Sequence, residues 1–295
     1  MKEKKQLVSI ITPSYNQGRF IEETINSVLG QDYPNIEYIV VDGASTDETL
    51  SVLKRYENRL KWISEKDRGQ SDAINKGFAM ATGDVLAWLA SDDTYFPGAI
   101  SKAVEALQSD NKIGLVYGKG RYIDEAGRPL GEYPTEVFDY ERLAVSNYIC
   151  QPSAFFTKEA LKTCGGVDTG LTFAMDYDLW MRMAKRVGFE YVEEYFSNFR
   201  LHKESKTVSA KNAPRREKEA LEAVMKYYGR APLNRVYGYC RGEAEMKGRF
   251  VGWRTFFMTI KEYIRLNRGI KMEDMRLLQP KLLAKLFKDK GALPR

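Results

Sequence analysis

Four apolar segments in the first 95 residues alternate with segments of helical periodicity, and this alternation constrains the fold more than any other feature of the chain. The apolar segments are LVSIITPSYN, IEYIVVDGAS, LKWISEKD and DVLAWLASDD. Continuous apolar runs bounded by turn residues are typical of strands buried on both faces of a sheet. Strands separated by helices indicate βαβ units. The sequence therefore predicts an α/β fold with a mixed, mostly parallel sheet flanked by helices.

A polar cluster follows each of the four predicted strands. The carboxyl ends of parallel strands meet at one edge of a sheet, and ligands of open α/β sheets bind there, so we expect these side chains to form a site. Its members are Thr12, Tyr15, Asp42, Ser45, Asp67, Asp92 and Asp93. The alternative is that these residues cap the following helices. Capping explains Ser45 or Thr46 as the N-cap of the next helix, but not the recurrence of acids at strand ends.

The adjacent acids Asp92 and Asp93 need compensation, because neighbouring carboxylates raise each other's pKa. A helix N-terminus, a basic side chain or a bound cation supplies such compensation. The pair alone therefore leaves both helix capping and metal binding open.

The later chain adds further strands and helices. PGAISKAVEALQSD reads as a helix, and strands are expected on both sides of the turn EAGRP. A strand and helix follow in YICQPSAFFTKEAL. The next helix carries Asp176 and Asp178 in its first turn and directs Leu179 and Met183, together with Val187, toward the core. A final strand ends at His202.

The net charge of +6 is unevenly distributed along the chain. Residues 211–295 contain 21 Lys and Arg against 9 Asp and Glu, a balance of +12, so residues 1–210 balance at −6. We expect one domain over residues 1–210, with halves at about 1–95 and 96–210, followed by a basic helical region over residues 211–295. A basic region of this kind favours a charged partner such as a membrane surface or a nucleic acid.

Cysteine and histidine are scarce. The three cysteines Cys150, Cys164 and Cys240 are odd in number and widely spaced, which argues against a disulfide framework and a Cys-rich zinc site. Any histidine chemistry has to use His202. No signal peptide is recognisable, and no apolar run approaches the roughly 20 residues that span a bilayer. We expect a cytoplasmic protein, at most peripheral on the inner membrane.

Several segments, in the expected order, resemble the inverting glycosyltransferases of family 2, which have the nucleotide-sugar-binding fold called GT-A. They are VSIITPSYNQGRFIEETINSVLGQDYPNIEYIVVDGASTDET, DRGQSDAINKG, WLASDD and FAMDYDLWMR, within residues 7 to about 205. SDAINKG, QPSAFF and MDYDLW together are similar to the branch that builds bacterial O-antigen, capsule and exopolysaccharide. The resemblance implies a Rossmann-like sheet and transfer of a hexosyl or N-acetylhexosaminyl group from a UDP-sugar, with inversion, to a lipid-linked glycan acceptor.

The resemblance also implies roles for the polar residues. Asp93 matches the carboxylate that binds Mn²⁺ or Mg²⁺, and His202 matches a residue that binds the metal or the diphosphate. Asp42 matches the residue that reads the uracil ring. The remaining donor contacts match Thr12, Pro13, Tyr15, Ser45, Asp67, Arg68, Asp72, Asn75, Ser91 and Asp92. Helix capping stays open for Asp72, and Arg200 and Lys206 are weaker candidates for contact with phosphate.

Inversion needs one base that deprotonates the acceptor hydroxyl. MDYDLW matches the form Glu-Asp-x-Asp-Leu-Trp of the family, with Met175 in place of the glutamate, so Asp176 is the expected base. The substitution at Met175 removes one acid. Asp178 and Trp180 are expected to contact the acceptor, with pairing to the helix dipole and core packing as their alternatives.

Residues 211–295 lie outside the resemblance. A stripe at alternating steps of four and three is formed by Met246, Phe250, Trp253, Phe257, Ile260 and Ile264. Basic residues flank it, which predicts contact of residues 242–290 with an anionic membrane. Packing on the catalytic domain or on the second subunit of a homodimer is the alternative. No nucleic-acid motif is recognisable, so no nucleic-acid partner is expected.

Two other functions stay open at this point. A sugar-nucleotide nucleotidyltransferase shares a βαβ sheet and an acidic metal site, but it ordinarily has a glycine-rich phosphate turn after the first strand, and TPSYNQGRF is a poor one. A scaffold that binds nucleotide or membrane without catalysis is the third alternative. The joint presence of Asp42, Asp93, Asp176 and His202 argues against it.

Overall fold

The computed structural model of this chain describes residues 6–247 and 253–268. The chain divides into two units, residues 1–208 and residues 209–295, which we call unit 1 and unit 2. Within the described ranges, no helix is both long enough and apolar enough to cross a membrane.

Unit 1 is built on one mixed sheet of nine strands. The strands are β1 (Val8–Ser14), β2 (Ile36–Asp42), β3 (Lys61–Ser64), β4 (Val85–Trp88), β5 (Thr94–Tyr95), β6 (Ile113–Ile123), β7 (Pro129–Glu132), β8 (Ala154–Thr157) and β9 (Gly188–Arg200). Their order across the sheet is β3-β2-β1-β4-β8-β6-β9-β5, and β7 pairs with β6 outside this path.

The strand directions bring six carboxyl ends to one edge of the sheet. β3, β2, β1 and β4 are parallel to one another. β8 is antiparallel to both β4 and β6, and β9 is parallel to β6, so β6 and β9 run in the same direction as the first four strands. The predicted parallel βαβ half is thereby confirmed, and the strand that leads to His202 ends at the same edge.

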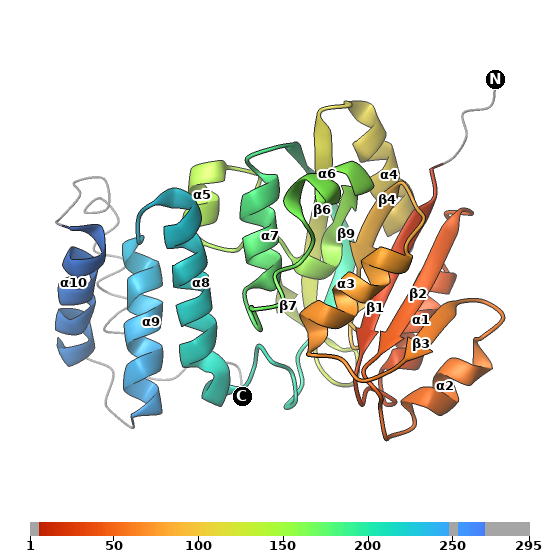
Figure 1. Cartoon of the computed structure of the whole chain (residues 1–295), viewed down its shortest axis with the longest axis horizontal. Coiled ribbons are helices and arrows are strands. Elements are labelled where there is room, and N and C mark those ends of the chain that lie inside the picture. Colours follow the sequence, from red (N-terminus) through yellow and green to blue (C-terminus); the bar gives the residue numbers. More distant parts are fainter. Residues whose placement is uncertain (1–5, 248–252, 269–295) are drawn as a thin grey trace. The chain divides into compact units, whose positions relative to one another are not determined.

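Helices cover both faces of the sheet (Figure 1). The helices of unit 1 are α1 (Ile21–Leu29), α2 (Thr49–Arg55), α3 (Gln70–Met80), α4 (Ala99–Ser109), α5 (Tyr140–Val145), α6 (Lys158–Cys164) and α7 (Met175–Met183), with a 3₁₀ turn η1 (Gln151–Ser153) before β8. Neither α5 nor η1 was predicted from the sequence, because both are too short to show a clear helical period.

Successive residues of β1 serve opposite faces, as the pleat of a strand requires. Ile10 packs into the core that α1, α2 and α4 form with the sheet. Ile11 faces α3, where a Cβ on Gly77 would lie 2.3 Å from the Ile11 side chain, so this glycine permits close packing of helix on sheet. On the same side Trp88 stacks on Trp180 of α7, with ring centroids 5.4 Å apart.

The start of α2 differs from the prediction. The helix begins after Glu48, and neither Ser45 nor Thr46 is its N-cap. Ser45 instead donates its hydroxyl to Asp42, and its Oγ accepts a hydrogen bond from the Asn16 backbone. These bonds tie the loop after β2 to the loop after β1.

Unit 2 consists of α8 (Ala213–Tyr228), α9 (Leu233–Met246) and α10 (Trp253–Asn267), with a short 3₁₀ turn η2 (Ala210–Asn212) before them. Its buried core is formed by Leu221, Ala231, Leu233, Val236, Cys240 and Tyr263. Of the apolar stripe expected from the sequence, Phe250 lies outside the described residues, as do residues 269–290.

Candidate active site

The register between β5 and β9 brings the acidic turn after β4 to the end of β9. Thr94 of β5 pairs with Asn198 of β9 in an antiparallel ladder. Two residues before Thr94 is Asp92, and two residues after Asn198 is Arg200, so these two lie opposite each other. His202 follows, and its Nε2 lies 2.9 Å from Oδ2 of Asp92. Residues that are 110 positions apart in the sequence thus form one pair at the expected edge.

The two adjacent aspartates have different surroundings, and this departs from the roles expected of them. Asp92 keeps 20% of its side chain exposed and faces His202. Asp93 is buried, and its Oδ1 accepts a hydrogen bond from the Arg200 backbone N–H at 2.8 Å. The structure therefore places Asp92, rather than the expected metal ligand Asp93, beside the histidine.

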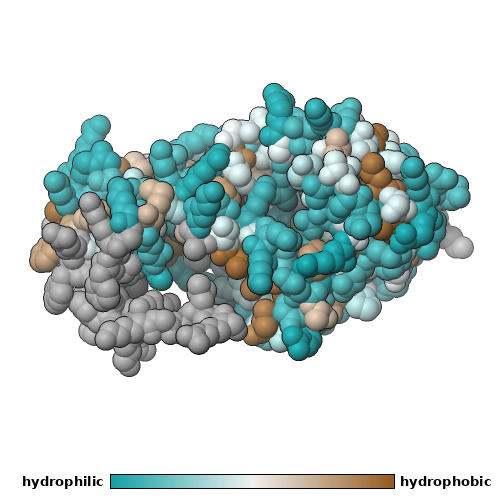
Figure 2. Space-filling model, turned by 90° about the horizontal axis from the view of Figure 1, so that it is seen from below, coloured by the Kyte–Doolittle hydropathy of each residue, from teal (hydrophilic) through white to brown (hydrophobic). Residues whose placement is uncertain are grey.

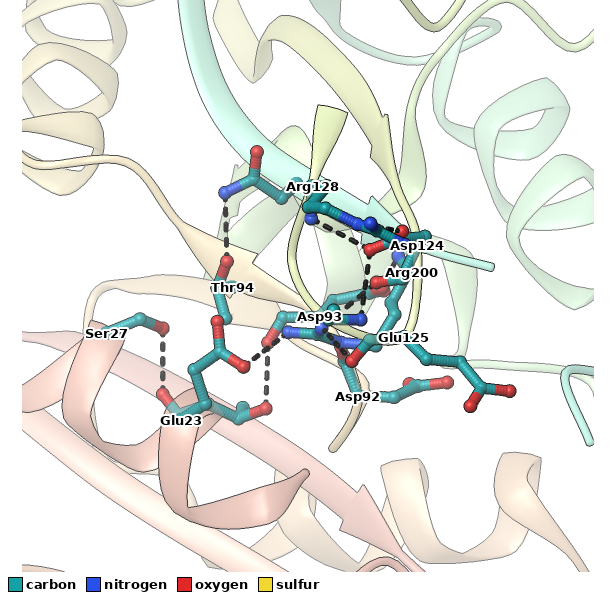
Figure 3. Close-up of polar contacts among 12 residues, drawn as sticks. Glu23, Ser27, Asp92, Asp93, Thr94, Asp124, Glu125, Arg128 and Arg200 are labelled. Atoms are coloured by element: carbon teal, nitrogen blue, oxygen red, sulfur yellow. Dashed lines mark hydrogen bonds and ion pairs between the residues drawn. The ribbon is translucent and has the colours of Figure 1, made fainter. Parts of the chain in front are cut away.

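Arg200 holds this turn from the inside (Figure 3). Its guanidinium is buried and donates to the carbonyl of Asp92 at 2.8 Å, to the carbonyls of Asp124 and Glu125 at 3.1 Å, and to the Glu23 carboxylate of α1 at 2.6 Å. These bonds join the acidic turn to α1 and to the turn between β6 and β7. Because its donors are all directed at the protein, Arg200 is not the phosphate contact that the sequence suggested.

The burial of Asp93 has an electrostatic consequence. Loss of water raises the pKa of Asp93 well above its ordinary value, and the charge of Asp92 raises it further. The hydrogen bond from the Arg200 backbone and the Arg200 charge oppose this shift. The sequence left three groups that could compensate the charge of the two aspartates, and the structure supplies the basic side chain, that of Arg200.

Several residues expected to line the nucleotide form an inner layer beneath the edge. Asp42 has no exposed surface and accepts hydrogen bonds from the Ser45 backbone at 2.9 Å, the Ser45 hydroxyl at 2.5 Å and the Ser64 hydroxyl at 2.6 Å. Thr12 is equally buried, with Oγ1 3.1 Å from the Tyr38 hydroxyl. Pro13 and Ser91 are buried as well. In this conformation these residues hold the loops in shape rather than facing a ligand.

An outer layer remains within reach of a ligand. Tyr15 is 60% exposed. A Cβ on Gly43 would lie 2.7 Å from the Asp67 carboxylate and 3.3 Å from the Tyr15 ring, so the lack of a side chain at Gly43 lets these two side chains pack against the backbone there. Gly43 is itself buried, and the exposed Tyr15 ring is the surface that a ligand can reach directly after β2.

In the segment that begins α3, Arg68 belongs to this outer layer, whereas Asn75 does not. Arg68 is exposed and donates to Asp72 at 2.9 Å, and this hydrogen bond lowers the pKa of Asp72. Asp72 also accepts from the Arg68 backbone at 3.1 Å. The side-chain amide of Asn75 donates a hydrogen bond to the Val167 carbonyl at 2.8 Å and accepts one from the Val167 N–H at 3.0 Å. Asn75 therefore fastens the loop before α7 and is not free to bind a nucleotide.

Asp176 lies in the first turn of α7, as predicted. Its Oδ2 accepts a hydrogen bond from Nδ2 of Asn147 at 3.1 Å. Burial raises the pKa of Asp176, while hydrogen bonds from the Tyr177 backbone and from Asn147 lower it. Burial raises the pKa of the Cys150 thiol to about 12, and the charges of Asp93 and Asp176 add to this shift, so each of the two carboxylates lies within electrostatic reach of this cysteine.

The other two residues expected on α7 to contact the acceptor have structural roles. Asp178 is buried and forms an ion pair with Arg182 at 2.6 Å. Trp180 is fully buried against Trp88 and Phe156. Neither side chain offers surface to an acceptor. Asp178 is paired within its own helix, and Trp180 packs in the core, as the alternative for each residue predicted.

Comparison with known proteins now adds to this geometry. The sequence profile described as glycosyl transferase family 2 matches residues 9–165. The chain belongs to this family. An uncharacterised glycosyltransferase of Rickettsia prowazekii is 31% identical over 70% of this chain and 67% of its own length. Chondroitin synthase of Escherichia coli is 30% identical over 68% of this chain.

These relatives differ in length from this family 2 glycosyltransferase. The chain spans 30% of the E. coli chondroitin synthase and 36% of an uncharacterised glycosyltransferase of Rickettsia conorii that is 33% identical over 70% of the chain. Whole-protein activities of such relatives therefore do not pass directly to it.

Solved structures show the GT-A fold. TarS of S. aureus, residues 1–349 in complex with UDP-GlcNAc, superposes with a TM-score of 0.67 at 17% identity over 95% of this chain and 86% of that one. The mannosyltransferase PcManGT of Pyrobaculum calidifontis, in complex with GDP-Man and Mn²⁺, superposes with a TM-score of 0.62 at 21% identity over 97% and 82%. At these identities the likeness concerns the fold, and the predicted GT-A fold is confirmed.

The residues of this glycosyltransferase fit a divalent cation in part. Two ligand atoms of one octahedral cation with bonds of about 2.1 Å lie about 3 Å apart, and Nε2 of His202 and Oδ2 of Asp92 are 2.9 Å apart. The other ring nitrogen of His202 is buried and has no hydrogen-bond partner among the described residues, and the Glu204 carboxylate lies 3.6 Å from it. Within the described ranges no three His, Cys, Asp or Glu side chains converge. The fit is therefore to a cation that takes its other ligands from a bound substrate.

Three important residues of the site were not assigned their roles from the sequence. Arg200 was considered only for phosphate, and neither Glu23 nor Asn147 was singled out. A signal existed for Arg200, which stands two positions before the only histidine on a strand predicted to end at the site. Asn147 lies in a loop without periodicity and gave no such signal.

Proposed function

We propose that this glycosyltransferase transfers a hexosyl or N-acetylhexosaminyl group from a UDP-sugar, with inversion and with help from Mn²⁺ or Mg²⁺, to a hydroxyl of a glycan. The observation that carries the proposal is the Asp92–His202 pair, 2.9 Å apart at the carboxyl edge of the sheet. In a family 2 glycosyltransferase this edge is where a nucleotide sugar is expected.

Asp92 and His202 would hold the cation, and Asp93 with Arg200 would keep Asp92 in place. The cation offsets the negative charge that builds on the departing diphosphate. This assignment exchanges the roles expected for the two acids, because only Asp92 faces His202. The partly exposed Asp92 is also the one that a diphosphate can approach.

Asp176 would act as the base toward the acceptor hydroxyl. A general base works best when its pKa is near the working pH, and burial shifts the pKa of Asp176 upward in that direction. The Asn147 amide orients the carboxylate through its hydrogen bond to Oδ2. Met175, which stands where the family pattern has a glutamate, is buried, with its sulfur 3.2 Å from the Ser71 hydroxyl. Asp176 therefore works without a neighbouring acid at that position.

On the donor side, the exposed Tyr15 ring would receive the nucleobase, with Asp67 packed beside it against Gly43 and with Arg68 and Asp72 at the rim. Asp42 would act indirectly, by shaping the loop through Ser45 and Ser64. The neighbours in solved structures carry UDP-GlcNAc in one case and GDP-Man in another, so the base has to be tested.

We infer a lipid-linked glycan acceptor in the synthesis of a bacterial surface polysaccharide such as O-antigen or capsule. The resemblance of SDAINKG, QPSAFF and MDYDLW to that branch supports it, as does the similarity to a chondroitin synthase. Membership of family 2 disfavours the nucleotidyltransferase alternative.

The test is calorimetric titration of UDP, GDP and dTDP into the purified protein, with and without Mn²⁺. We expect UDP to bind in the presence of Mn²⁺ and the other nucleotides to bind at least about tenfold more weakly. A panel of UDP-sugars then identifies the sugar by release of UDP. Equal affinity for the three nucleotides would overturn the choice of UDP, and absence of all binding would overturn the donor site.

A further inference from the structure

The last described helix of unit 2 presents an unusual surface. α10 turns Thr255, Thr259 and Tyr263 inward, and Tyr263 joins the core that α8 and α9 form. The hydroxyl of Thr259 donates to the Thr255 carbonyl one turn earlier at 2.8 Å, so the threonine is satisfied within its own helix and can be buried. Two threonines thus lie on the inner face of α10, where Ile260 and Leu266 also pack against the core.

The outer face of α10 carries three further large apolar side chains. Phe257 is 64% exposed, Ile264 39% and Met258 38%. Phe257 and Ile264 are two helical turns apart and therefore lie on one side of the helix. Met246, near the end of α9, is also exposed, so α9 and α10 hold four of the eight large hydrophobic residues that are exposed among those described. On the face of the molecule drawn in Figure 2, the coloured hydrophobic residues form only small patches on a largely hydrophilic surface.

Cations share this outer face. Lys261, Arg265 and Arg268 are exposed at positions that continue the side marked by Phe257 and Ile264. The only acid of α10 is Glu262, which is less exposed and forms an ion pair with Arg265. Lys261 and Arg268 therefore give the outer face a net positive charge. This face, defined by Phe257, Met258, Lys261, Ile264, Arg265 and Arg268, is called the outer face of α10 below.

We propose that the outer face of α10 docks on an anionic lipid surface. The centre of a protein interface is depleted of charged residues, whereas here cations and apolar side chains are interleaved on one narrow strip. At a bilayer surface this mixture is favourable, because apolar side chains enter the acyl boundary while long cationic side chains reach the phosphate groups. The excess of +12 in residues 211–295 strengthens the attraction to anionic lipid. Three apolar side chains give reversible association, which suits an enzyme that visits a lipid-linked acceptor.

The test is sedimentation of the full chain with vesicles of phosphatidylcholine alone and of phosphatidylcholine with one quarter phosphatidylglycerol. We expect binding to the anionic vesicles, much weaker binding to the neutral ones, and loss of binding in high salt. Phe257→Ser with Ile264→Ser should lower the partition coefficient about tenfold or more. Lys261→Gln with Arg268→Gln should lower it about fivefold for each cation, and only for anionic vesicles.

A matched control removes two exposed apolar side chains from unit 1. Leu130→Ser with Val137→Ser should leave vesicle binding unchanged, since both residues are exposed but belong to the catalytic unit. Light scattering of the free protein tests for a second copy on this face. No binding to either vesicle, equal binding by the α10 variants and wild type, or a dimer that the Phe257 and Ile264 changes dissociate would each overturn the proposal. Circular dichroism confirms that the variants fold.

Discussion

The acidic turn after β4 and the first turn of α7 both supply carboxylates to the site, but they are held very differently. The turn at Asp92 and Asp93 receives hydrogen bonds from the Arg200 backbone and guanidinium, and the Asp93 carbonyl accepts a further one from Thr24 of α1. Asp176 of α7 receives one side-chain hydrogen bond, from Asn147. One carboxylate pair is fixed by three elements, whereas the other carboxylate is held lightly.

The difference matches two kinds of chemistry. A cation and a diphosphate are bound best by groups already in place, because no free energy is then spent on ordering them. A base has to gain and lose a proton, and a carboxylate with a single side-chain hydrogen bond and a raised pKa can do so within an accessible pH range. We therefore propose that the turn of Asp92 and Asp93 with Arg200, called the clamp below, serves donor binding, and that Asp176 serves catalysis.

Arg200→Met should have the largest effect, because it removes the donors that join the acidic turn to its neighbours. Breaking such a buried polar network typically costs about 3–5 kcal/mol in the free energy of unfolding, and we expect Mn²⁺-dependent binding of UDP to be lost with it. Urea denaturation followed by tryptophan fluorescence measures the first effect. Arg128→Met is the matched control, since Arg128 is exposed and pairs with Asp124 nearby; its cost should stay below about 1 kcal/mol. Similar stability of both variants would contradict the stabilising role of Arg200 in the acidic turn.

Asp176→Asn should lower kcat by a factor of about 10² to 10⁴ and leave UDP affinity unchanged. It should also raise stability at pH 7. Burial raises the pKa of Asp176 in the folded state, so the unfolded chain loses this proton first and wild-type stability falls as pH rises from the ordinary Asp range to the raised pKa. Denaturation at pH 7 and at pH 3.5 checks this, and the difference should shrink at the lower pH.

Asp178→Asn is the control on the same helix. It breaks the buried ion pair with Arg182 and should destabilise the protein, in the opposite direction to Asp176→Asn. If both variants were destabilised equally at pH 7, the raised pKa of Asp176 would not be supported.

Asn147→Leu should have a smaller effect, visible in the pH profile of kcat/KM. Removing the Asn147 hydrogen bond takes away a group that lowers the pKa of Asp176, so the acid limb of the profile should move to higher pH. Activity at pH values well above that limb should be less affected. A uniform loss at every pH would indicate that Asn147 acts only on the structure of the loop.

Glu23→Gln should have the smallest effect. Glu23 accepts one of the Arg200 hydrogen bonds, but its side chain is 57% exposed, so solvent screens the pair. We expect a loss below about 1 kcal/mol in the free energy of unfolding and UDP binding close to wild type. A loss as large as that of Arg200→Met would show that the clamp depends on its contact with α1 rather than on the turn.

The sequence predicted the architecture and the edge of the sheet where the site lies, because both follow from local patterns. Continuous apolar runs marked the buried strands, and polar residues marked their ends. The arrival of His202 at this edge was also predicted, since its strand was recognisable.

The sequence could not distinguish Asp92 from Asp93. Which of two adjacent residues faces a partner depends on strand register, and here the register is set by pairing of Thr94 with Asn198. Burial of Asp42 was likewise hidden, because its partner Ser64 comes from another strand. The expected apolar stripe on α10 had the correct period, but the helix buries threonines that bond to their own backbone, which a hydrophobic pattern does not anticipate.

We propose that Asp92, rather than Asp93, works with His202 to hold the cation of the donor. This assignment is tested by calorimetric titration of UDP with and without Mn²⁺ into wild type, Asp92→Asn and Asp93→Asn, each checked for folding by circular dichroism. We predict that Asp92→Asn loses the Mn²⁺-dependent part of the binding, whereas Asp93→Asn keeps it within a factor of about ten. Loss in Asp93→Asn with retention in Asp92→Asn would contradict the account.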